Sequence, residues 1–337
     1  MFKALTEWLR GLRIGVKLVL VLFLVTAAAG TVQVLRVLID NDSAISITAF
    51  RVSSLDDLNT AAIPASPAVV EADIEGVDVG IIADPFFWQE GDTTHLFFEV
   101  VDNTADDGVI ALASGSIESG FEYRGTVLKE PFHLSYPHVF AANGSVWMIP
   151  ESWEAGAIRL YRADHFPNRW SFVGNLVEGG EFVDPTPFHH DGRWWMFVGD
   201  RSNGRLDLYF SDRLESGWTA HPQNPLIENN PDVARPGGRM IEDQGRLYRV
   251  GQDAFPEYGT AVGLFEIVTL SETAYREVPL ARNPVLTGSG KGWNADGMHH
   301  LDLQWMGDHW LGVADGHDSW KVLRGTPYTW AKSKTIE

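Results

Sequence analysis

Two aspartates, each followed by proline, lie 100 residues apart in similar apolar surroundings: Asp84 in ADPFFW and Asp184 in VDPTPF. Two carboxyl groups can divide the work of breaking a glycosidic bond, because one stays ionised while the other is tuned to hold a proton. An Asp at a turn also commonly uses its carboxylate to accept nearby backbone N–H groups. The equivalent settings of the two aspartates favour a catalytic interpretation of both.

Glu151, in MIPES, is the candidate proton donor. It ends an apolar segment between Trp147 and Trp153, where loss of hydration would raise its pKa. The alternative is a glutamate at the rim of the site that forms an ion pair with Arg159 or Arg162.

Further polar residues begin or end neighbouring apolar segments. Arg235 and Arg239, in ARPGGR, suit either a bidentate clamp for an anionic group or the neutralisation of nearby carboxylates. We expect no cofactor and no metal, because the paired histidines of GMHH lack the spacing of a metal site; a channel cation such as calcium, held with Asp302 or Asp315, is the alternative. The residues expected to bind substrate, besides the two arginines, are His138, Gln252, Asp253, His299 and His300.

A pattern repeated five times positions these residues. Each copy reads as an apolar strand, a polar turn and a second strand rich in aromatic residues, and the copies begin about 50 residues apart. This spacing predicts an all-β fold, a five-bladed β-propeller whose first strands line a central channel. The residues predicted to open the five copies toward the channel are Asp84, His138, Asp184, Arg235 and the pair His299/His300.

The repeat also predicts the organisation of the chain. Residues 81–330 form the propeller, residues 41–80 a connector, and residues 1–40 a cytoplasmic tail with a membrane anchor. Within the connector, AISITAFRV alternates like a strand that closes the ring with the last blade. The predicted blade limits are about 81–114, an end near 163 for blade two, 170–212 for blade three and 275–323 for blade five.

Composition excludes several classes of protein. The 337 residues carry a formal charge of −19 with no basic stripe, so nucleic acid is not an expected partner. The chain has no cysteine, which excludes disulfides, thiolate metal sites and a cysteine nucleophile. Its 33 Gly, 13 Trp and 18 Phe suit many short strands joined by tight turns.

The N-terminal segment predicts an extracytoplasmic propeller. Leu18–Leu35 is uncharged and long enough to span a bilayer, and Arg10, Arg13 and Lys17 precede it. The positive-inside rule keeps these basic residues in the cytoplasm, so we expect a single-pass signal anchor. A cleaved signal peptide is the alternative, because the small residues at 27–29 resemble a cleavage site.

Several motifs resemble the family named for the N-terminal domain of plant glucosamine inositolphosphorylceramide transferase. The resemblance covers roughly residues 80–280 and implies a propeller related to glycan processing, with a glycan or glycolipid as partner. Sugar transfer in the plant enzymes is usually credited to a separate C-terminal domain, for which this chain has no room. The motifs are ADPFFW, PFHLSYPHVF, MIPE, LYRADHFPNRW, HPQNP, ARPGGR and GQDAFPEYG.

A more distant resemblance is to the five-bladed glycoside hydrolases of families 43, 32 and 68. It implies that Asp84 is the general base, that Asp184 orients and tunes the acid, and that GMHH at Gly297 lies near the channel. The general acid of family 43 is a Glu that opens blade four, whereas this chain has Ala234-Arg235-Pro236 there. Arginine cannot donate a proton near neutral pH, so the hydrolytic pair is incomplete unless Glu151 replaces the acid.

Three hypotheses follow. The first is a glycosidase-type enzyme that acts on a charged glycan or glycolipid. Asp84 would be its base or nucleophile, Glu151 its acid, and Asp184 the residue that orients the acid and tunes its pKa. The second is a non-catalytic glycan-binding or assembly propeller that kept the channel but lost the acid. The third is a sugar transferase of glycolipid or polysaccharide synthesis.

Overall fold

The computed structural model describes residues 27–28, 31–104 and 107–329. Its contacts divide the chain into one compact unit, residues 44–318, and a second unit made of the residues on either side. In the described residues the regular structure is β-strand, with five short 3₁₀ turns. These turns are Leu55–Asp57, Thr60–Ala62, Glu71–Asp73, Trp153–Ala155 and Gly292–Asn294.

Five antiparallel sheets confirm the predicted five-bladed propeller. Blade one contains β3 (Val79–Glu90), β4 (Thr93–Asp102), β5 (Asp107–Ser116) and β6 (Gly120–Leu128). Blade two contains β7 (Ser135–Ala142), β8 (Ser145–Glu151), β9 (Ala157–His165) and β10 (Arg169–Glu178). Blade three contains β11 (Phe182–His190), β12 (Arg193–Asp200), β13 (Leu206–Ser211) and β14 (Thr219–Ala220). Blade four contains β15 (Ile241–Asp243), β16 (Arg246–Asp253), β17 (Ala261–Leu270) and β18 (Tyr275–Pro279), with β19 (Leu286–Thr287) paired to β17.

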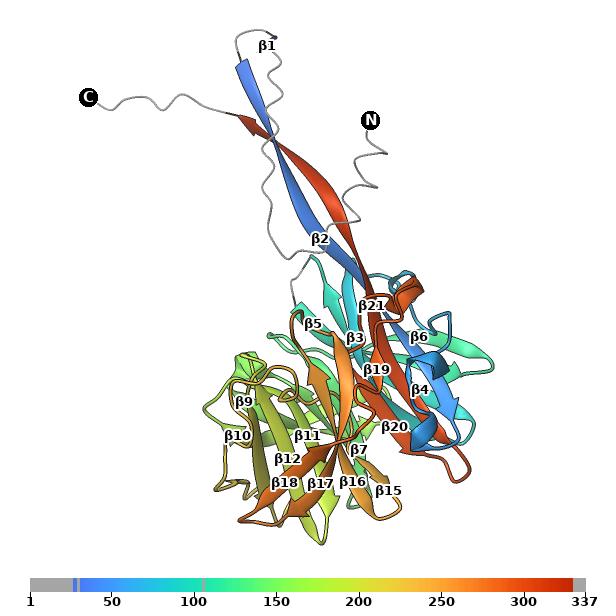
Figure 1. Ribbon diagram of the computed structural model, residues 1–337, viewed down its shortest axis with the longest axis vertical. Coiled ribbons are helices and arrows are strands. Elements are labelled where there is room, and N and C mark those ends of the chain that lie inside the picture. Colours follow the sequence, from blue (N-terminus) through green and yellow to red (C-terminus); the bar gives the residue numbers. More distant parts are fainter. Residues whose placement is uncertain (1–26, 29–30, 105–106, 330–337) are drawn as a thin grey trace, which may run out of the picture. The chain divides into compact units, whose positions relative to one another are not determined.

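Blade five joins the two ends of the propeller. Its strands β1 (Ala27–Ala28), β2 (Thr31–Val52), β21 (Trp310–Thr329) and β20 (Leu301–Trp305) pair in that order. Figure 1 shows the N-terminal strand β2, in blue, beside the C-terminal strand β21, in red. The segment AISITAFRV belongs to β2, so a strand from before the first blade pairs with a strand of the last. Such pairing removes free sheet edges.

The expected transmembrane segment, Leu18–Leu35, lies mostly outside the described residues. The residues from Thr31 onward that the structure describes belong to strand β2. No helix in the described part of the chain is long and apolar enough to cross a membrane.

The predicted blade limits are wrong at the outer strands. Strand β10 pairs with β9 and completes blade two, and β18 pairs with β17 and completes blade four, although each was assigned to the next blade. Outer strands are exposed on one face and are therefore more polar than the inner strands. Strand β6, for example, alternates between exposed and half-buried residues along most of its length. Weak hydrophobicity makes such strands hard to assign from sequence.

Apolar residues fill the spaces between blades. Phe97 from blade one packs in one buried cluster with Met148 and Trp170 from blade two. Met196 of blade three lies in a further cluster with Trp147 of blade two. Each fully buried side chain of this size contributes about 1.5–3 kcal/mol. The inter-blade packing therefore holds the inner strands in fixed positions around the channel.

Each of the first three blades begins with the same backbone distortion. Asp84, Tyr136 and Asp184 have φ values of 54°, 46° and 49°, and each precedes a proline. Pairing with the second strand shifts register at these positions, because proline donates no hydrogen bond. Tyr136, and not His138 as predicted, is therefore the blade-two equivalent of the two aspartates.

Gly238 is expected to be indispensable where blade four meets blade five. It has φ +148°, and a Cβ there would lie 1.8 Å from the Leu301 carbonyl oxygen. We predict that Gly238→Ala lowers the free energy of unfolding by at least about 2 kcal/mol, measured by urea denaturation. Gly174→Ala, where a Cβ would meet nothing within 4 Å, is the control and should change it by less than about 0.5 kcal/mol. Equal effects of the two substitutions would contradict the steric argument.

Candidate functional site

The three predicted catalytic residues are buried, and they come from inner strands of blades one, two and three. Asp84 in the middle of β3, Glu151 at the end of β8 and Asp184 near the start of β11 are each at most 5 % exposed. Asp84 and Asp184 both lie at a bulge before a proline in the first strand of a blade, and Glu151 ends a second strand. This arrangement follows from antiparallel pairing, which places the start of a blade's first strand beside the end of its second.

Arg235 joins two of the carboxyl groups. Its Nε donates to Asp184 Oδ2 at 2.5 Å, and one terminal nitrogen lies 3.4 Å from Glu151 Oε2. Its other terminal nitrogen donates to Asn203 Oδ1 at 2.7 Å. Glu151 Oε2 also accepts the backbone N–H of Asp184 at 3.1 Å. Three blades are therefore connected through one guanidinium group.

Glu151 is in an environment that favours its protonated form. Burial, and then the charge of Asp184, raise its pKa well above the usual range, although Arg235 opposes this shift. The predicted alternative, an ion pair of Glu151 with Arg159 or Arg162, is not what the structure shows. Arg159 pairs with Glu130 instead. A carboxyl group that stays protonated near neutral pH is what a general acid requires.

Asp84 is held in the opposite state by His299. The two ring nitrogens of His299 lie 3.2 Å from Asp84 Oδ1 and 3.1 Å from Asp315 Oδ1. An ionised carboxylate only accepts hydrogen bonds, so both contacts are satisfied when the imidazole carries both protons. Burial opposes the charges, yet the pKa of His299 is raised to about 9 by Asp315 and Asp84, and that of Asp84 is lowered to about 2, chiefly by His299. Asp84 is therefore ionised and fixed in place.

Arg239 forms the second buried arginine pair. Its Nε donates to Asp302 Oδ1 at 2.7 Å, and a terminal nitrogen donates to the Val139 carbonyl at 2.8 Å. Its remaining terminal nitrogen lies 3.3 Å from His138 Nε2. Both arginines of ARPGGR thus neutralise channel carboxylates, which is the second of the two roles considered for them.

Carboxylates also stabilise the distorted openings of two blades. Asp315 Oδ2 accepts the backbone N–H of Asp84 at 2.9 Å, just as Glu151 accepts that of Asp184. In each case the acceptor comes from the preceding blade around the ring. Tyr136 takes part differently, since its hydroxyl lies 2.8 Å from the hydroxyl of Thr186, which donates to the Asp184 carbonyl. Sequence reasoning missed Tyr136, although its place before proline matches that of the two aspartates.

The other predicted binding residues differ in their accessibility. Gln252 and His300 are fully buried, and among the described residues neither Gln252 Nε2 nor the ring nitrogens of His300 have a hydrogen-bond partner. His138 is buried too, and its ring stacks on Phe86 with centroids 4.7 Å apart. Asp253 is partly exposed and accepts the N–H of Phe255. The structure thus gathers the histidines in the channel and leaves Asp253 at its end.

Among the described residues, one group has ligand atoms close enough together to coordinate a metal cation. The donor atoms of Asp84, His299 and Asp315 all lie within 4.8 Å of one another. A metal ion would require a neutral His299, because a ring nitrogen that carries a proton cannot coordinate. The two carboxylates favour the protonated ring, so they fit a buried ion triad better than a metal site.

The entrance to the site carries partly exposed aromatic rings. Tyr258 is 46 % exposed, and its ring centroid lies 5.0 Å from the guanidinium carbon of Arg235 and 5.2 Å from the ring of His299. Trp153, two residues beyond Glu151, is half-buried. Rings of this kind can stack on the apolar face of a sugar. Sequence analysis did not single out Tyr258, although it lies in the motif GQDAFPEYG.

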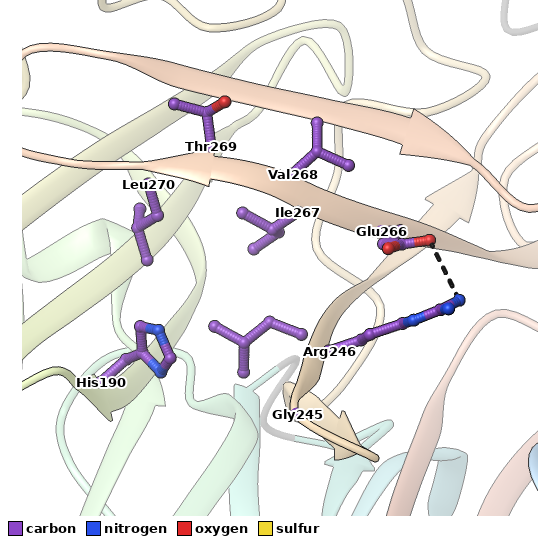
Figure 2. A pocket seen from close by; sticks show the side chains of 9 residues that line it. His190, Gly245, Arg246, Glu266, Ile267, Val268, Thr269 and Leu270 are labelled. Atoms are coloured by element: carbon purple, nitrogen blue, oxygen red, sulfur yellow. Dashed lines mark ion pairs between the residues drawn. The ribbon is translucent and has the colours of Figure 1, made fainter.

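The hollow in Figure 2 is not part of this site. It is lined by His190, at the end of β11, and by residues of β16 and β17 that include Arg246 and Glu266. Asp184 is at the start of β11 and His190 at its end, about 20 Å apart at the rise of a strand. The hollow lies at the opposite end of the strands from the buried carboxylates.

Comparison with known proteins identifies the family. The model of the family "Glucosamine inositolphosphorylceramide transferase 1, N-terminal" matches residues 37–317. The chain belongs to this family. It is 36 % identical over 252 residues to glucosamine inositolphosphorylceramide transferase 1 of Arabidopsis thaliana and 35 % identical to that of Oryza sativa subsp. japonica. These matches cover 72 % of this chain but only 33 % and 34 % of the plant proteins, so the chain spans about a third of their length.

Solved structures show the same fold at low identity. The catalytic domain of the Coprinopsis cinerea GH62 α-L-arabinofuranosidase superimposes with a TM-score of 0.55 and 14 % identity, over 79 % of this chain and 97 % of that domain. A thermostable family-43 glycoside hydrolase gives 0.53 and 12 %, over 66 % and 82 %. The resemblances seen in the sequence, to the transferase family and to propeller hydrolases, are therefore confirmed.

The ion triad predicts a pH dependence of stability. The pKa of His299 rises from 6.5 to about 9 on folding, so its contribution is fully present below pH 6.5 and is lost as the pH rises through 9. A shift of this size corresponds to on the order of 3 kcal/mol. We predict that the wild type loses stability between pH 6.5 and 9 by urea unfolding, and that His299→Gln makes this loss smaller; the raised pKa of Glu151 leaves a remaining dependence of the same sign. His165→Gln, at an exposed histidine, should behave like the wild type; an unchanged slope in His299→Gln would contradict the assignment.

Proposed function

We propose that this protein is a carbohydrate-active propeller that breaks a glycosidic bond in a charged glycan or glycolipid. The observation that carries the proposal is the pair of carboxyl groups held in opposite protonation states, Glu151 by burial beside Asp184 and Asp84 by its contact with His299. The aromatic ring of Tyr258 beside them supplies a surface for a sugar ring.

The proposed chemistry follows from these states. Glu151 gives its proton to the leaving oxygen as the carbon–oxygen bond breaks, and Asp184 and Arg235 hold it in position. Asp84 stays negative, so it either activates a water molecule or attacks the sugar carbon, and it stabilises the positive charge that develops on the ring. Asp184 acts through Glu151, because its charge helps to keep the acid protonated.

A non-catalytic glycan-binding propeller is the second candidate. Two observations favour it. Arg235 stands where the family-43 enzymes have their general acid, and a carboxylate with a pKa of about 2, such as Asp84, is a weak base. The relatives named as transferases make a role in sugar transfer a further candidate, although this chain spans only a third of their length.

The location of the protein is part of the proposal. A signal anchor at Leu18–Leu35 would place the propeller outside the cytoplasm and close to the membrane. The plant relatives are named for inositolphosphorylceramide, which contains a ceramide lipid. A tether at the membrane would bring the channel near such a substrate.

Substitution of the proposed acid and base tests the mechanism. Glu151→Gln and Asp84→Asn, in the full chain, should each lower turnover at least about 100-fold, because each removes a proton transfer or a charge needed in the transition state. Turnover would be measured by mass spectrometry with a panel of neutral, uronate-bearing and phosphorylated glycans. Glu215→Gln, at an exposed glutamate, is the control and should keep full activity. Binding of a glycan without turnover in the wild type would replace the enzyme with the binding candidate.

The pH profile tests the two protonation states separately. Activity requires a protonated Glu151 and an ionised Asp84, so turnover should fall as the pH rises through the elevated pKa of Glu151 and should also fall in strong acid, where Asp84 gains a proton. A rate that instead rises steadily with pH would show that Glu151 is not the acid.

A further inference from the structure

The exposed Arg201 stacks on the half-buried ring of Trp153, close in sequence to the residues of the buried site. Arg201 directly follows β12, and its guanidinium carbon lies 3.7 Å from the centroid of the Trp153 ring. Stacking on an indole face orients a guanidinium while leaving the N–H groups at its edge free to bind. The pair is therefore pre-organised for a ligand.

The pair adjoins the buried site through two short connections. Trp153 lies two residues beyond Glu151, and Arg201 lies two residues before Asn203. Glu151 and Asn203 both contact the guanidinium of Arg235. Arg201 and Trp153 are therefore each two residues from a group that contacts Arg235.

The positive charge of Arg201 is available to a ligand, whereas those of the buried arginines are paired with carboxylates. Arg235 and Arg239 are occupied by Asp184, Glu151 and Asp302. Arg201, in contrast, is exposed, and in the part of the chain that the structure describes it has no hydrogen bond or ion pair. In a chain with a formal charge of −19, such an arginine is a local site of attraction for anions.

We infer that Arg201, stacked on Trp153, binds the anionic group of the substrate, and that this group is a phosphate attached to a polyol. A planar guanidinium matches the oxygen atoms of a phosphate in a bidentate geometry. The inositol-phosphoryl group in the names of the relatives has this chemistry. The inference rests on the proposed function, because it names the substrate class of the same channel. Anion recognition thus lies at the entrance and not in the buried arginine pair.

Binding of two soluble probes tests the inference. The full chain, in detergent, would be titrated with myo-inositol 1-phosphate and with myo-inositol by calorimetry. Arg201→Ala should weaken binding of the phosphate about 10- to 100-fold, and Arg201→Lys by less, because lysine keeps the charge but loses the planar fork. Arg246→Ala is the control, since Arg246 is an exposed arginine in the distant hollow of Figure 2 and should not affect binding. Equal affinity of the wild type and Arg201→Ala, or no binding of the phosphate by the wild type, would overturn the inference.

A vesicle experiment distinguishes a lipid headgroup from a free phosphate. If the phosphate belongs to a lipid, the wild type should bind vesicles of phosphatidylcholine with phosphatidylinositol more strongly than phosphatidylcholine alone, and Arg201→Ala should lose the difference. If only the soluble phosphate shows the Arg201 effect, the source is a free sugar phosphate.

The Glu151→Gln variant keeps this inference separate from the proposed chemistry. Glu151→Gln should lose cleavage and still bind the phosphate as the wild type does. Phosphate binding that depends on Arg201, in a wild type that cleaves no glycan, would support the anion site and refute the chemistry. Cleavage that is equally efficient for phosphorylated and neutral glycans in Arg201→Ala and the wild type would support the chemistry and refute the anion site.

Discussion

The pairing of buried charges across blades is the constraint on which the rest of the site depends. Isolated charges are too costly to bury, so each must have an opposite partner and further hydrogen bonds. Three largely buried cations, Arg235, Arg239 and His299, each reach another blade. Arg235 extends from blade four to Asp184 and Glu151, Arg239 from blade four to Asp302, and His299 from blade five to Asp84. Removal of any one of these cations would leave an unpaired carboxylate in a dry interior.

This pairing also sets the chemical states of the two carboxyl groups. Asp84 shares a protonated imidazole with Asp315 and remains ionised. Glu151 gains a proton more easily because it is buried and lies beside the charge of Asp184, although Arg235 opposes this shift of its pKa. The resemblance to family-43 enzymes leads one to expect a glutamate at the start of blade four, where this chain has Arg235. A proton donor from blade two, as proposed for Glu151, would be compatible with that arginine. The same replacement also fits a binding protein, so chemistry must be decided by turnover.

The sequence predicted the fold because inner strands are apolar, repeated and marked by proline. It predicted the positions of Asp84 and Asp184 for the same reason. It failed at the outer strands, such as β10 and β18, whose exposed faces weaken the periodic signal. It predicts His138 where Tyr136 stands, because His138 is the polar residue of this segment, whereas the shared place before proline identifies Tyr136. The individual carboxylate partners of the arginines could not be predicted, since they come from residues 51 to 84 positions away that meet only when the ring closes.

These contacts give the buried cations and the exposed residues different roles. Deep in the channel, the cations are occupied by carboxylates and therefore contribute structure and control of protonation, but little direct attraction for an anion. At the entrance, Arg201 and the exposed ring of Tyr258 are free to contact a ligand. A substrate with a phosphate near its sugar would meet both kinds of group, one for selection and the other for chemistry. Related chains that keep the buried pairs but change the entrance residues would then share a fold and a reaction while differing in the glycans that they accept.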